Sequence, residues 1–401
     1  MSTATLAQIS ATVGTPTYVY HAPTFVRQFQ QLTQAFSGFQ HTIFYACKAL
    51  TNINIIKLLY SAGANIDCSS INEAKLALHA GCHPSRVLYT SNGISFQEIT
   101  EAVELGVHVN IDSLNNLKKF GEKFGASRPI GIRLRPNIMA GGNLKISTGH
   151  DKSKFGIPVT QLPEILAIAH QYQLNITTLH VHTGSEIKDV QVTVKALEIL
   201  LDLLPQFPDV KHIDLGGGFK VPYSPTDGET NLQELGNALA QTLETYSSKG
   251  FPTPKLWFEP GKYMVSEAGY LLTQVAVMKQ TDTICFASVN SGLNHLIRPM
   301  FYDAYHHISN ISNPSGPKKT YTIVGNICET DTFASDRELP EIQEGDLLLF
   351  HNAGAYGFEM ASNFNSRFKP AEVLVFEDET FAMIRRADVW DDLLRNQIAV
   401  L

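Results

Sequence analysis

Lys48 is the residue whose type and position point most directly to chemistry. It follows an apolar run, residues 42–47 (TIFYAC), that is typical of a buried strand in a parallel sheet. Such sheets place their active residues at the C-terminal ends of their strands. A lysine partly removed from water there has a lowered pKa, and its amine can attack a carbonyl, as a Schiff-base lysine must. The alternative is a strand-end lysine that only reaches back to water.

Residues suited to acid–base and cofactor chemistry recur at the C-terminal ends of other predicted strands. They are Asp67, Ser91, Asp112, Arg133, His182, Ser185, the glycine turn at residues 216–218, and Glu259. In a closed barrel these ends meet at one mouth. Bare backbone amides of the glycine turn could cradle a phosphate. An amine nucleophile, a phosphate cradle, a ring stacker and a carboxylate for a pyridine nitrogen together describe a pyridoxal phosphate site.

Each member of this set also has a plainer interpretation. His180 and His182 could form a metal pair, but no nearby cysteine or carboxylate in the sequence completes a zinc set, so we expect no metal. His182 is then a ring stacker and His180 a core histidine. The three glycines match neither the P-loop nor GxGxxG and could form only a tight turn. Glu259 could be a solvated loop residue, although a carboxylate at a barrel mouth also holds a pyridine nitrogen protonated.

The elements that must position these residues are short apolar runs alternating with helix-period stretches. Strands are expected at residues 41–49, 65–70, 86–91, 108–113, 129–135, 177–185, 212–219 and 255–261. Helices are expected between them, at residues 53–62, 70–80, 95–104, 113–124, 159–171, 190–204 and 231–248. Eight such units predict a (β/α)8 TIM-like barrel over residues 22–265. An open doubly wound sheet would need a Gly-rich dinucleotide turn after its first strand, and the sequence has none there.

After residue 261 the pattern changes to β-rich segments without regular helices. Strands are expected at residues 270–278, 284–289, 321–324, 346–350, 371–376 and 381–384. Short strands separated by Gly, Pro, Asn and Asp predict an antiparallel sheet or barrel. We therefore expect a β-rich C-terminal domain over residues 266–401, joined by an N-terminal strand at residues 17–20 within the segment 1–21.

Composition narrows the compartment and the partners. The chain has 401 residues, of which 44% are hydrophobic and 17% charged, as in a soluble globular protein with room for two domains. No apolar run is long enough to cross a bilayer, and the first residues do not resemble a secretory signal. The five scattered cysteines lack CxxC spacing, which favours reduced thiols in the cytoplasm. A net charge of −7 without a basic block argues against nucleic acid or a membrane surface as partner.

Six ordered motifs carry a resemblance to a known family. They are residues 44–49 (FYACKA), 180–185 (HVHTGS), 216–219 (GGGF), 259–262 (EPGK), 324–329 (VGNICE) and 353–358 (AGAYGF). In this order they resemble the motifs of pyridoxal phosphate decarboxylases with the alanine-racemase-like fold. Within that family the chain is most similar to the diaminopimelate decarboxylases, from about Thr15 to Arg386.

The resemblance implies a role for each matching residue. Lys48 would bind the cofactor covalently, His182 would stack on its ring, Glu259 would face its pyridine nitrogen and Arg133 its phenolic oxygen. Other cofactor contacts would come from Asp67, Ser185, Gly217, Gly218, Gly261, Lys262 and Tyr356. Substrate contacts would come from Lys262, Arg298, Tyr302, Glu329 and Tyr356, and the proton donor would be Cys328. The family usually has arginine where this chain has Lys262, which lacks the two-pronged fork.

The resemblance also implies an activity and an assembly. The expected reaction is decarboxylation of meso-2,6-diaminopimelate to L-lysine and carbon dioxide. It would take place in a homodimer with shared active sites, where Cys328 and Glu329 reach into the neighbouring subunit's site. One alternative is a related decarboxylase acting on carboxynorspermidine, ornithine or lysine, in which Arg298 would be idle. A second is a non-catalytic regulatory paralogue, against which the retention of Lys48, His182, Glu259 and Cys328 argues.

Overall fold

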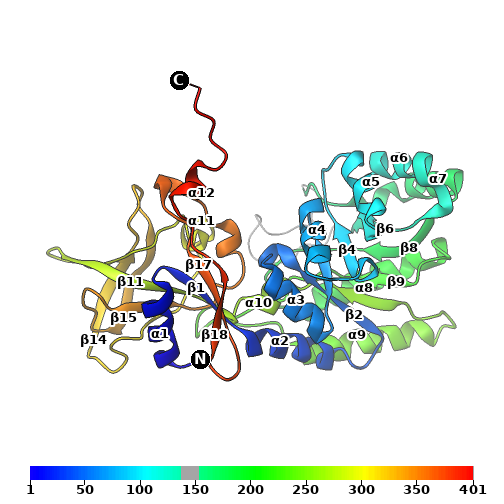
Figure 1. The fold of residues 1–401 in the computed structure, drawn as a ribbon. Coiled ribbons are helices and arrows are strands. Elements are labelled where there is room, and N and C mark those ends of the chain that lie inside the picture. Colours follow the sequence, from blue (N-terminus) through cyan, green and yellow to red (C-terminus); the bar gives the residue numbers. More distant parts are fainter. Residues whose placement is uncertain (137–152, 401) are drawn as a thin grey trace. The chain divides into compact units, whose positions relative to one another are not determined.

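The computed structural model describes residues 1–136 and 153–400 (Figure 1). The chain divides into two compact units. The barrel unit contains Val26–Val221 and Gly228–Met264, and the β unit contains Met1–Phe25, Pro222–Asp227 and Val265–Leu401. Part of the domain predicted at residues 22–265, residues 137–152, lies outside the described residues. The predicted domain boundaries stay a prediction, and the β unit as found here also takes a short segment from the middle of the chain.

In the described part of the chain, eight parallel strands close the barrel unit. They are β2 (His41–Ala46), β3 (Asn65–Cys68), β4 (Val87–Thr90), β5 (His108–Ile111), β6 (Pro129–Arg135), β8 (Asn175–His180), β9 (His212–Asp214) and β10 (Lys255–Phe258). Their order is β5-β4-β3-β2-β10-β9-β8-β6, and the pairing of β5 with β6 closes the ring. The short β7 (Ile157–Pro158) adds to β6. The predicted (β/α)8 fold class is confirmed.

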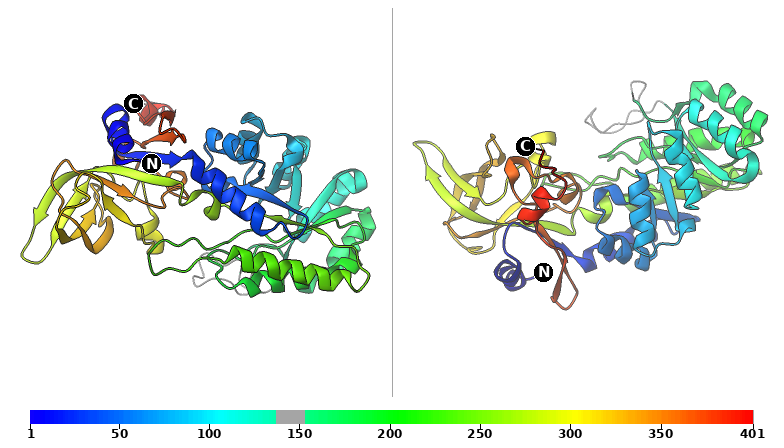
Figure 2. Two further views of the ribbon diagram at one scale, coloured as in Figure 1. Left: turned by 90° about the horizontal axis from the view of Figure 1, so that it is seen from below. Right: turned by 45° about the horizontal axis from the view of Figure 1, so that its top comes forward.

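Helices lie on the outside of these strands (Figure 1; Figure 2). They are α2 (Ala22–Ala35), α3 (Ile53–Ala62), α4 (Ile71–His79), α5 (Phe96–Glu104), α6 (Leu114–Phe124), α7 (Leu162–Tyr172), α8 (Val190–Leu203) and α9 (Leu232–Ser247). Polar caps fix several of their starts. The side chains of Ser70, Ser95 and Ser113 each accept a hydrogen bond from the backbone N–H three residues on, which satisfies one orphan donor of the helix. The predicted helices are found, whereas α2 was not predicted.

The strands end earlier than the sequence predicts. Strand β2 stops at Ala46, and Lys48 lies in a 3₁₀ turn (Cys47–Ala49) that is closed by the Leu50 N–H donating to the Cys47 carbonyl. Strand β9 likewise stops at Asp214, before the glycine turn. The expectation that these strands continue through the site residues is therefore wrong. The chain leaves the sheet first, and the chemical groups stand on the turns above the strand ends.

The β unit is a nine-stranded sheet within the described residues. Its strands are β1 (Thr17–His21), β11 (Gly269–Gln280), β12 (Cys285–Val289), β13 (Ile308–Asn310), β14 (Lys318–Val324), β15 (Thr332–Pro340), β16 (Leu347–Phe350), β17 (Ala371–Val375) and β18 (Phe381–Arg385). Most neighbours are antiparallel, but β1 with β17 and β12 with β14 are parallel. The predicted β-rich domain is confirmed, and its sheet is mixed rather than antiparallel because β1 runs parallel to β17 and β12 runs parallel to β14.

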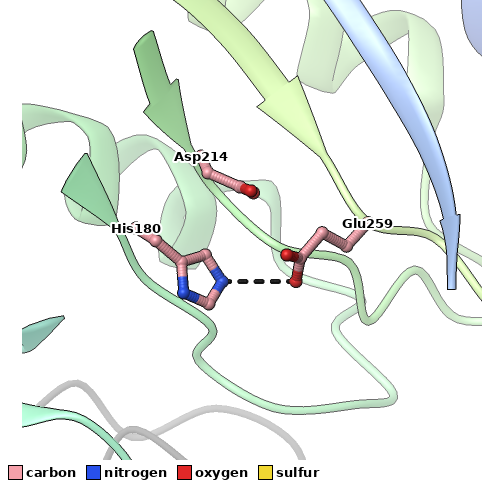
Figure 3. A group of neighbouring side chains, drawn as sticks. All are labelled: His180, Asp214 and Glu259. Carbon is pink, nitrogen blue, oxygen red and sulfur yellow. Dashed lines mark ion pairs between the residues drawn. The ribbon is translucent and has the colours of Figure 1, made fainter. Parts of the chain in front are cut away.

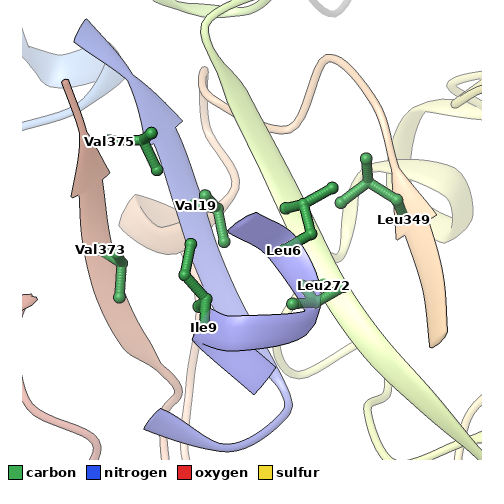
Figure 4. Close-up of a cluster of buried hydrophobic side chains, with 7 residues drawn as sticks. All are labelled: Leu6, Ile9, Val19, Leu272, Leu349, Val373 and Val375. Atoms are coloured by element: carbon green, nitrogen blue, oxygen red, sulfur yellow. The ribbon is translucent and has the colours of Figure 1, made fainter. Parts of the chain in front are cut away.

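A buried apolar cluster ties the N-terminus to this sheet. Helix α1 (Thr3–Val13) begins at the cap residue Ser2 and turns Leu6 and Ile9 inward. Figure 4 shows them against side chains from four strands, namely Val19, Leu272, Leu349, Val373 and Val375. Removing such side chains from water is the main favourable term in folding. The remaining short helices are α10 (Lys262–Val265), α11 (Arg298–Tyr302) and α12 (Trp390–Leu394).

None of the helices in the described residues combines the length and the apolar character that crossing a bilayer requires.

Candidate active site

The C-terminal ends of the barrel strands bring most of the predicted site residues of the barrel unit to one end of the ring. Lys48 follows β2, Asp67 is in β3, Arg133 is in β6, His182 follows β8, and Glu259 follows β10. The backbone holds these ends together: the Glu259 N–H donates to the Gly216 carbonyl at 2.7 Å, and the Ala46 N–H donates to the Pro260 carbonyl at 3.2 Å. The barrel therefore assembles residues that are more than two hundred positions apart in sequence.

Lys48 pairs with Asp67 across two neighbouring strand ends. The Lys48 ammonium lies 3.5 Å from the Asp67 carboxylate. The lysine side chain keeps 39% of its surface exposed, whereas the aspartate side chain keeps only 1%. Burial raises the pKa of Asp67, the nearby Glu259 raises it further, and Lys48 offsets part of this. The amine is thus open to a small molecule while its partner carboxylate is fixed in the protein.

Glu259 lies in a cluster of buried polar groups, shown in Figure 3 with His180 and Asp214. His180 Nε2 is 3.2 Å from Glu259 Oε2. Burial alone would raise the pKa of Glu259, but His180 and then Lys48 lower it, so the carboxylate is ionised. Burial and the neighbouring Glu259 raise the pKa of Asp214, and burial lowers that of His180. An ionised carboxylate is what a protonated pyridine nitrogen needs beside it.

Donor atoms of His180, Asp214 and Glu259 all lie within 4.8 Å of one another. The structure thus brings carboxylates to His180 that the sequence alone did not place near it. The expectation that the chain uses no metal stays a prediction. The same three groups can also form a polar cluster around the Glu259 carboxylate without a metal, because burial lowers the pKa of His180 and raises that of Asp214.

His182 presents an uncharged ring. Burial, followed by the charges of Arg133 and Lys48, lowers its pKa. The Gly217 N–H donates to His182 Nδ1 at 3.3 Å, so the proton of the neutral ring is on Nε2. A neutral imidazole held by a backbone donor is a suitable surface for a flat aromatic cofactor ring.

The glycine turn requires its glycines. A Cβ at Gly217 would lie 2.3 Å from the Glu259 carbonyl oxygen. A Cβ at Gly218, where φ is +95°, would lie 2.0 Å from the Gly184 carbonyl oxygen. Any side chain here would fill the space and displace the neighbouring backbone. Together with the exposed amine and the ionised carboxylate, this turn fits a pyridine cofactor that carries a phosphate.

Lys262 is bound by a residue that sequence reasoning missed. Its ammonium and that of Lys220 both pair with the carboxylate of Glu186, and all three side chains are mostly buried. Glu186 follows Ser185 directly, in a left-handed conformation with φ of 63°. The signal that could have found Glu186 is Lys262 itself, because an ammonium group held in a mostly buried position needs an acidic partner.

Other residues missed from the sequence are polar groups at strand ends. Thr90 closes β4, Asn110 is in β5, and Asp214 closes β9. Thr90 and Asn110 are hydrogen-bonded near Glu259, and all three are buried. A polar residue in an otherwise apolar strand is the signal that could have found them, since a buried polar side chain needs a partner.

The remaining predicted site residues belong to the β unit. Arg298 is buried in α11, with its guanidinium 5.0 Å from the Tyr223 ring centroid and 5.8 Å from that of Tyr302. Its Nε has no hydrogen-bond partner among the described residues. Cys328 is exposed, and its N–H donates to Asn365 Oδ1 at 2.7 Å. Glu329 is exposed next to it, and Tyr356 has φ of 56°.

Fold and site together define a pyridoxal-dependent decarboxylase, and the sequence comparison agrees. Residues 23–266 match the family described as pyridoxal-dependent decarboxylase, pyridoxal binding domain. Diaminopimelate decarboxylase of Methanothermobacter thermautotrophicus is 37% identical, over 96% of this chain and 92% of that one. The enzyme of the same name from Aquifex aeolicus is 35% identical, over 98% and 94%.

A solved structure gives the same result. The crystal structure of diaminopimelate decarboxylase from Helicobacter pylori complexed with L-lysine is 32% identical, with a TM-score of 0.89 over 97% of this chain and 98% of that one. The chain belongs to the diaminopimelate decarboxylase family. The predicted family, enzyme class and pyridoxal phosphate cofactor are confirmed.

Proposed function

We propose that this protein decarboxylates meso-2,6-diaminopimelate to L-lysine and carbon dioxide. One carbon–carbon bond breaks, and a proton takes the place of the departing carboxylate on the same carbon. The observation that carries the proposal is the barrel mouth, where an accessible lysine amine, an ionised buried carboxylate and a glycine turn lie together. The relatives that bear this name cover nearly the whole chain.

The residues of the barrel mouth fit pyridoxal phosphate. Lys48 would hold it covalently, the turn at Gly217 and Gly218 with Ser185 and Tyr356 would receive its phosphate, Gly261 would add a further cofactor contact, and His182 would face its ring. Asp67 and Arg133, which are buried close by, complete this part of the site. When bound, the cofactor takes up the electrons left on the substrate carbon as carbon dioxide departs.

The protein's own groups prepare the mouth for this chemistry. Asp67 holds the Lys48 ammonium from a buried position, so the amine is oriented before any ligand arrives. Glu259, as an anion, supplies the opposite charge that a ring nitrogen needs to keep its proton. Neutral His182 adds flat contact area without competing charge.

Substrate groups would be bound by residues of the β unit. The far end of the substrate bears both an amine and a carboxylate. Arg298 suits the carboxylate, because its Nε is buried without a partner among the described residues, and Glu329 suits the ammonium. Cys328 would give the proton to the carbon, while Tyr302 and Tyr356 would line the pocket. Lys262, paired with Glu186, would act mainly as a positive charge near the C-terminal ends of the barrel strands.

We also propose that the protein is a cytoplasmic homodimer with shared active sites and without a metal. All five cysteines lie in the described residues and are free thiols, which favours a reducing compartment. The exposed position of Cys328 is compatible with a role at a subunit boundary.

Two alternatives lead to different measurements. Ornithine, lysine and carboxynorspermidine lack a distal carboxylate next to an amine, so an enzyme for them would leave Arg298 unused. A regulatory paralogue would bind partners and release no carbon dioxide. The deciding experiment supplies purified protein and cofactor with each amino acid in turn and follows carbon dioxide. We expect release from meso-2,6-diaminopimelate alone, and release from ornithine or lysine, or no release, would reject the proposal.

The shared site has its own test. Lys48→Ala and Cys328→Ala proteins, each nearly inactive, are mixed under conditions that exchange subunits. Random pairing makes about half of the dimers mixed, and each mixed dimer holds one intact site, so activity should recover to roughly a quarter of the wild-type level. Exchange is verified with tagged chains. If exchange occurs and activity stays absent, both residues act within one subunit.

A further inference from the structure

The environment of Glu259 is more elaborate than one carboxylate beside a ring nitrogen requires. Glu259, which follows β10, is 7% exposed, and buried polar side chains from four other strands lie around it. These are Thr90 from β4, Asn110 from β5, His180 from β8 and Asp214 from β9. None of them is assigned a role by the function proposed above.

One oxygen of Glu259 is bound through a two-step relay. Thr90 Oγ1 donates to Glu259 Oε1 at 3.0 Å, and Asn110 Nδ2 donates to Thr90 Oγ1 at 2.9 Å. A hydroxyl has one proton to give. Because the Asn110 amide fills the acceptor side of the hydroxyl, the Thr90 proton is directed at Glu259. The relay therefore fixes both the position of Oε1 and the direction of the hydrogen bond.

The other oxygen faces His180. His180 is fully buried, and its Nε2 lies 3.2 Å from Glu259 Oε2. Neither ring nitrogen has a hydrogen-bond partner of regular geometry in the described part of the chain, and Glu259 Oε2 is the acceptor that lies within ion-pair distance of Nε2. The neutral ring carries one proton, and the side that faces the carboxylate is where this proton has an acceptor. Oε1 of Glu259 thus accepts a hydrogen bond from Thr90, and Oε2 has the His180 ring beside it as a possible donor.

Asp214 is placed to add a third neutral group. Its Oδ1 accepts the Gly216 N–H at 2.9 Å, while Oδ2 is buried and has no partner among the residues described. Two ionised carboxylates cannot share so small a buried volume without a cation between them. When Asp214 is protonated this repulsion is absent, and its carboxyl O–H is available as a donor in the cluster of His180, Asp214 and Glu259 that Figure 3 shows.

We propose that Thr90, His180 and Asp214 are positioning residues that keep the Glu259 carboxylate ionised and fix its orientation. The proton between Glu259 and the ring nitrogen of a bound pyridine cofactor is then held by the nitrogen and not by Glu259. Donors to the charged form of a carboxylate make it a weaker base. The proton then stays on the nitrogen, which is the state in which the ring best accepts electrons. This inference rests on the proposed function and assigns to these residues a part of its chemistry.

The test locates the proton directly. Full-length protein is loaded with pyridoxal phosphate labelled with ¹⁵N in its ring, and nitrogen NMR distinguishes the protonated from the unprotonated ring. We expect a protonated ring in the wild type. Thr90→Val should move the signal toward the unprotonated position and lower kcat by about tenfold or more, as for a lost hydrogen bond to a charged group, with little change in KM. Thr90→Ser should restore both.

The other two residues are tested by pairs of variants. His180→Gln keeps an N–H near the Nε2 position and should retain a protonated ring, whereas His180→Phe should lose it. Asp214→Asn is neutral with nearly the same shape and should retain the protonated ring, whereas Asp214→Leu should lose it. Thr100→Val is the matched control, because Thr100 is also buried but donates to the Phe96 carbonyl within α5. Its ring signal should match the wild type.

The outcomes separate the two levels of the proposal. A wild type that does not bind the labelled cofactor would overturn the proposed function and this inference with it. A wild type with a protonated ring, together with a Thr90→Val protein that binds cofactor and keeps the same signal, would overturn this inference alone. A signal lost equally in Thr90→Val and in the Thr100→Val control would also overturn it, because the effect would then come from general disturbance of the barrel.

Discussion

Apart from the pair of β2 with β10, the main strands of the barrel unit pair with strands that neighbour them in the chain, whereas the β unit also pairs β1 with strands hundreds of residues away. Strand β2 lies beside β3, with one helix between them in sequence. In the β unit, Thr17 of β1 is paired with Leu272 on one side and Ala371 on the other. Local pairing can be read from periodicity, but pairing over such separations depends on the finished fold. In the barrel unit, the order of the strands in the sequence therefore predicts which site residues lie together.

The strand ends of the barrel unit and the apolar cluster under α1 bury different groups, although the β unit also buries polar side chains such as Arg298 and Glu372 elsewhere. The barrel unit buries charged and polar side chains at its strand ends, among them Asp67, Arg133, Asp214 and Glu259. The apolar cluster under α1 in the β unit consists of Leu, Ile and Val side chains. Buried charge costs stability unless it is paired, so the polar groups in the barrel indicate function, whereas the apolar cluster indicates stability. Substitutions in the two units should therefore fail in different ways.

The largest expected effect is on chemistry in the barrel unit. Glu259→Gln should bind cofactor and stay folded but lose about 10²–10³-fold in kcat, since a neutral amide cannot balance a protonated ring. The control is Glu198→Gln, an exposed glutamate on α8, which should behave as wild type. Steady-state kinetics and circular dichroism make the comparison. Near-normal turnover in Glu259→Gln would mean that the ring nitrogen is balanced by another residue.

A change in the apolar cluster should act on stability. Ile9→Ala removes a fully buried side chain from the cluster under α1 and should lower the free energy of unfolding by about 2–5 kcal/mol. Ile53→Ala, at a position on α3 that is 37% exposed, should cost about 0.5 kcal/mol or less. Urea unfolding with hydrogen exchange measures both. Equal losses in the two variants would contradict the assignment of the cluster as the core of the β unit.

The Glu186 pair should give a pH-dependent effect. Burial alone would raise the pKa of Glu186, but Lys262 and Lys220 lower it, so its stabilising contribution is present above the unfolded value of about 4.3 and is lost as pH falls. Glu186→Gln leaves two mostly buried ammonium groups without this partner and should cost about 1–3 kcal/mol at neutral pH. The difference from wild type should shrink below about pH 4. A difference that grows in acid would contradict the ion-pair assignment.

Helix caps should give the smallest effects, and these should be alike in both units. Ser95→Ala removes the cap of α5 in the barrel unit, and Ser2→Ala removes the cap of α1 in the β unit. Each should cost about 1 kcal/mol, because each leaves one backbone N–H without its acceptor. Urea midpoints of the two variants provide the test. Costs that differ several-fold would show that local capping does not act independently of the surrounding unit.

Much of the fold could be predicted because its signals are local. The helix-period stretches located most barrel helices, and the eight strands followed from short apolar runs. Helix α1 and strand β15 were missed for opposite reasons. The first has mainly small and polar residues, and β15 carries Asp336, Arg337 and Glu338 in its centre. The structure of α1 comes from packing against distant strands, and that of β15 from pairing with the preceding strand β14, rather than from their own patterns.

The candidate site was predictable where chemistry sits at a strand end. Lys48 and Glu259 were proposed in this way, and the structure places both just after strand ends, although the turn that holds Lys48 was not predicted. Thr90 and Glu186 were missed because their importance lies in what they contact, Glu259 in one case and Lys262 in the other. Contacts between residues so far apart in sequence appear only when the barrel closes.

The central claim is that the barrel mouth is a pyridoxal phosphate site built on Lys48. The most direct measurement is borohydride reduction of the purified protein with pyridoxal phosphate, followed by peptide mass mapping. The cofactor mass should be found on the peptide that contains Lys48, near one equivalent per chain, and should be absent from that peptide after Lys48→Ala. Cofactor found on a different lysine, or on none in the wild type, would contradict the assignment of this site.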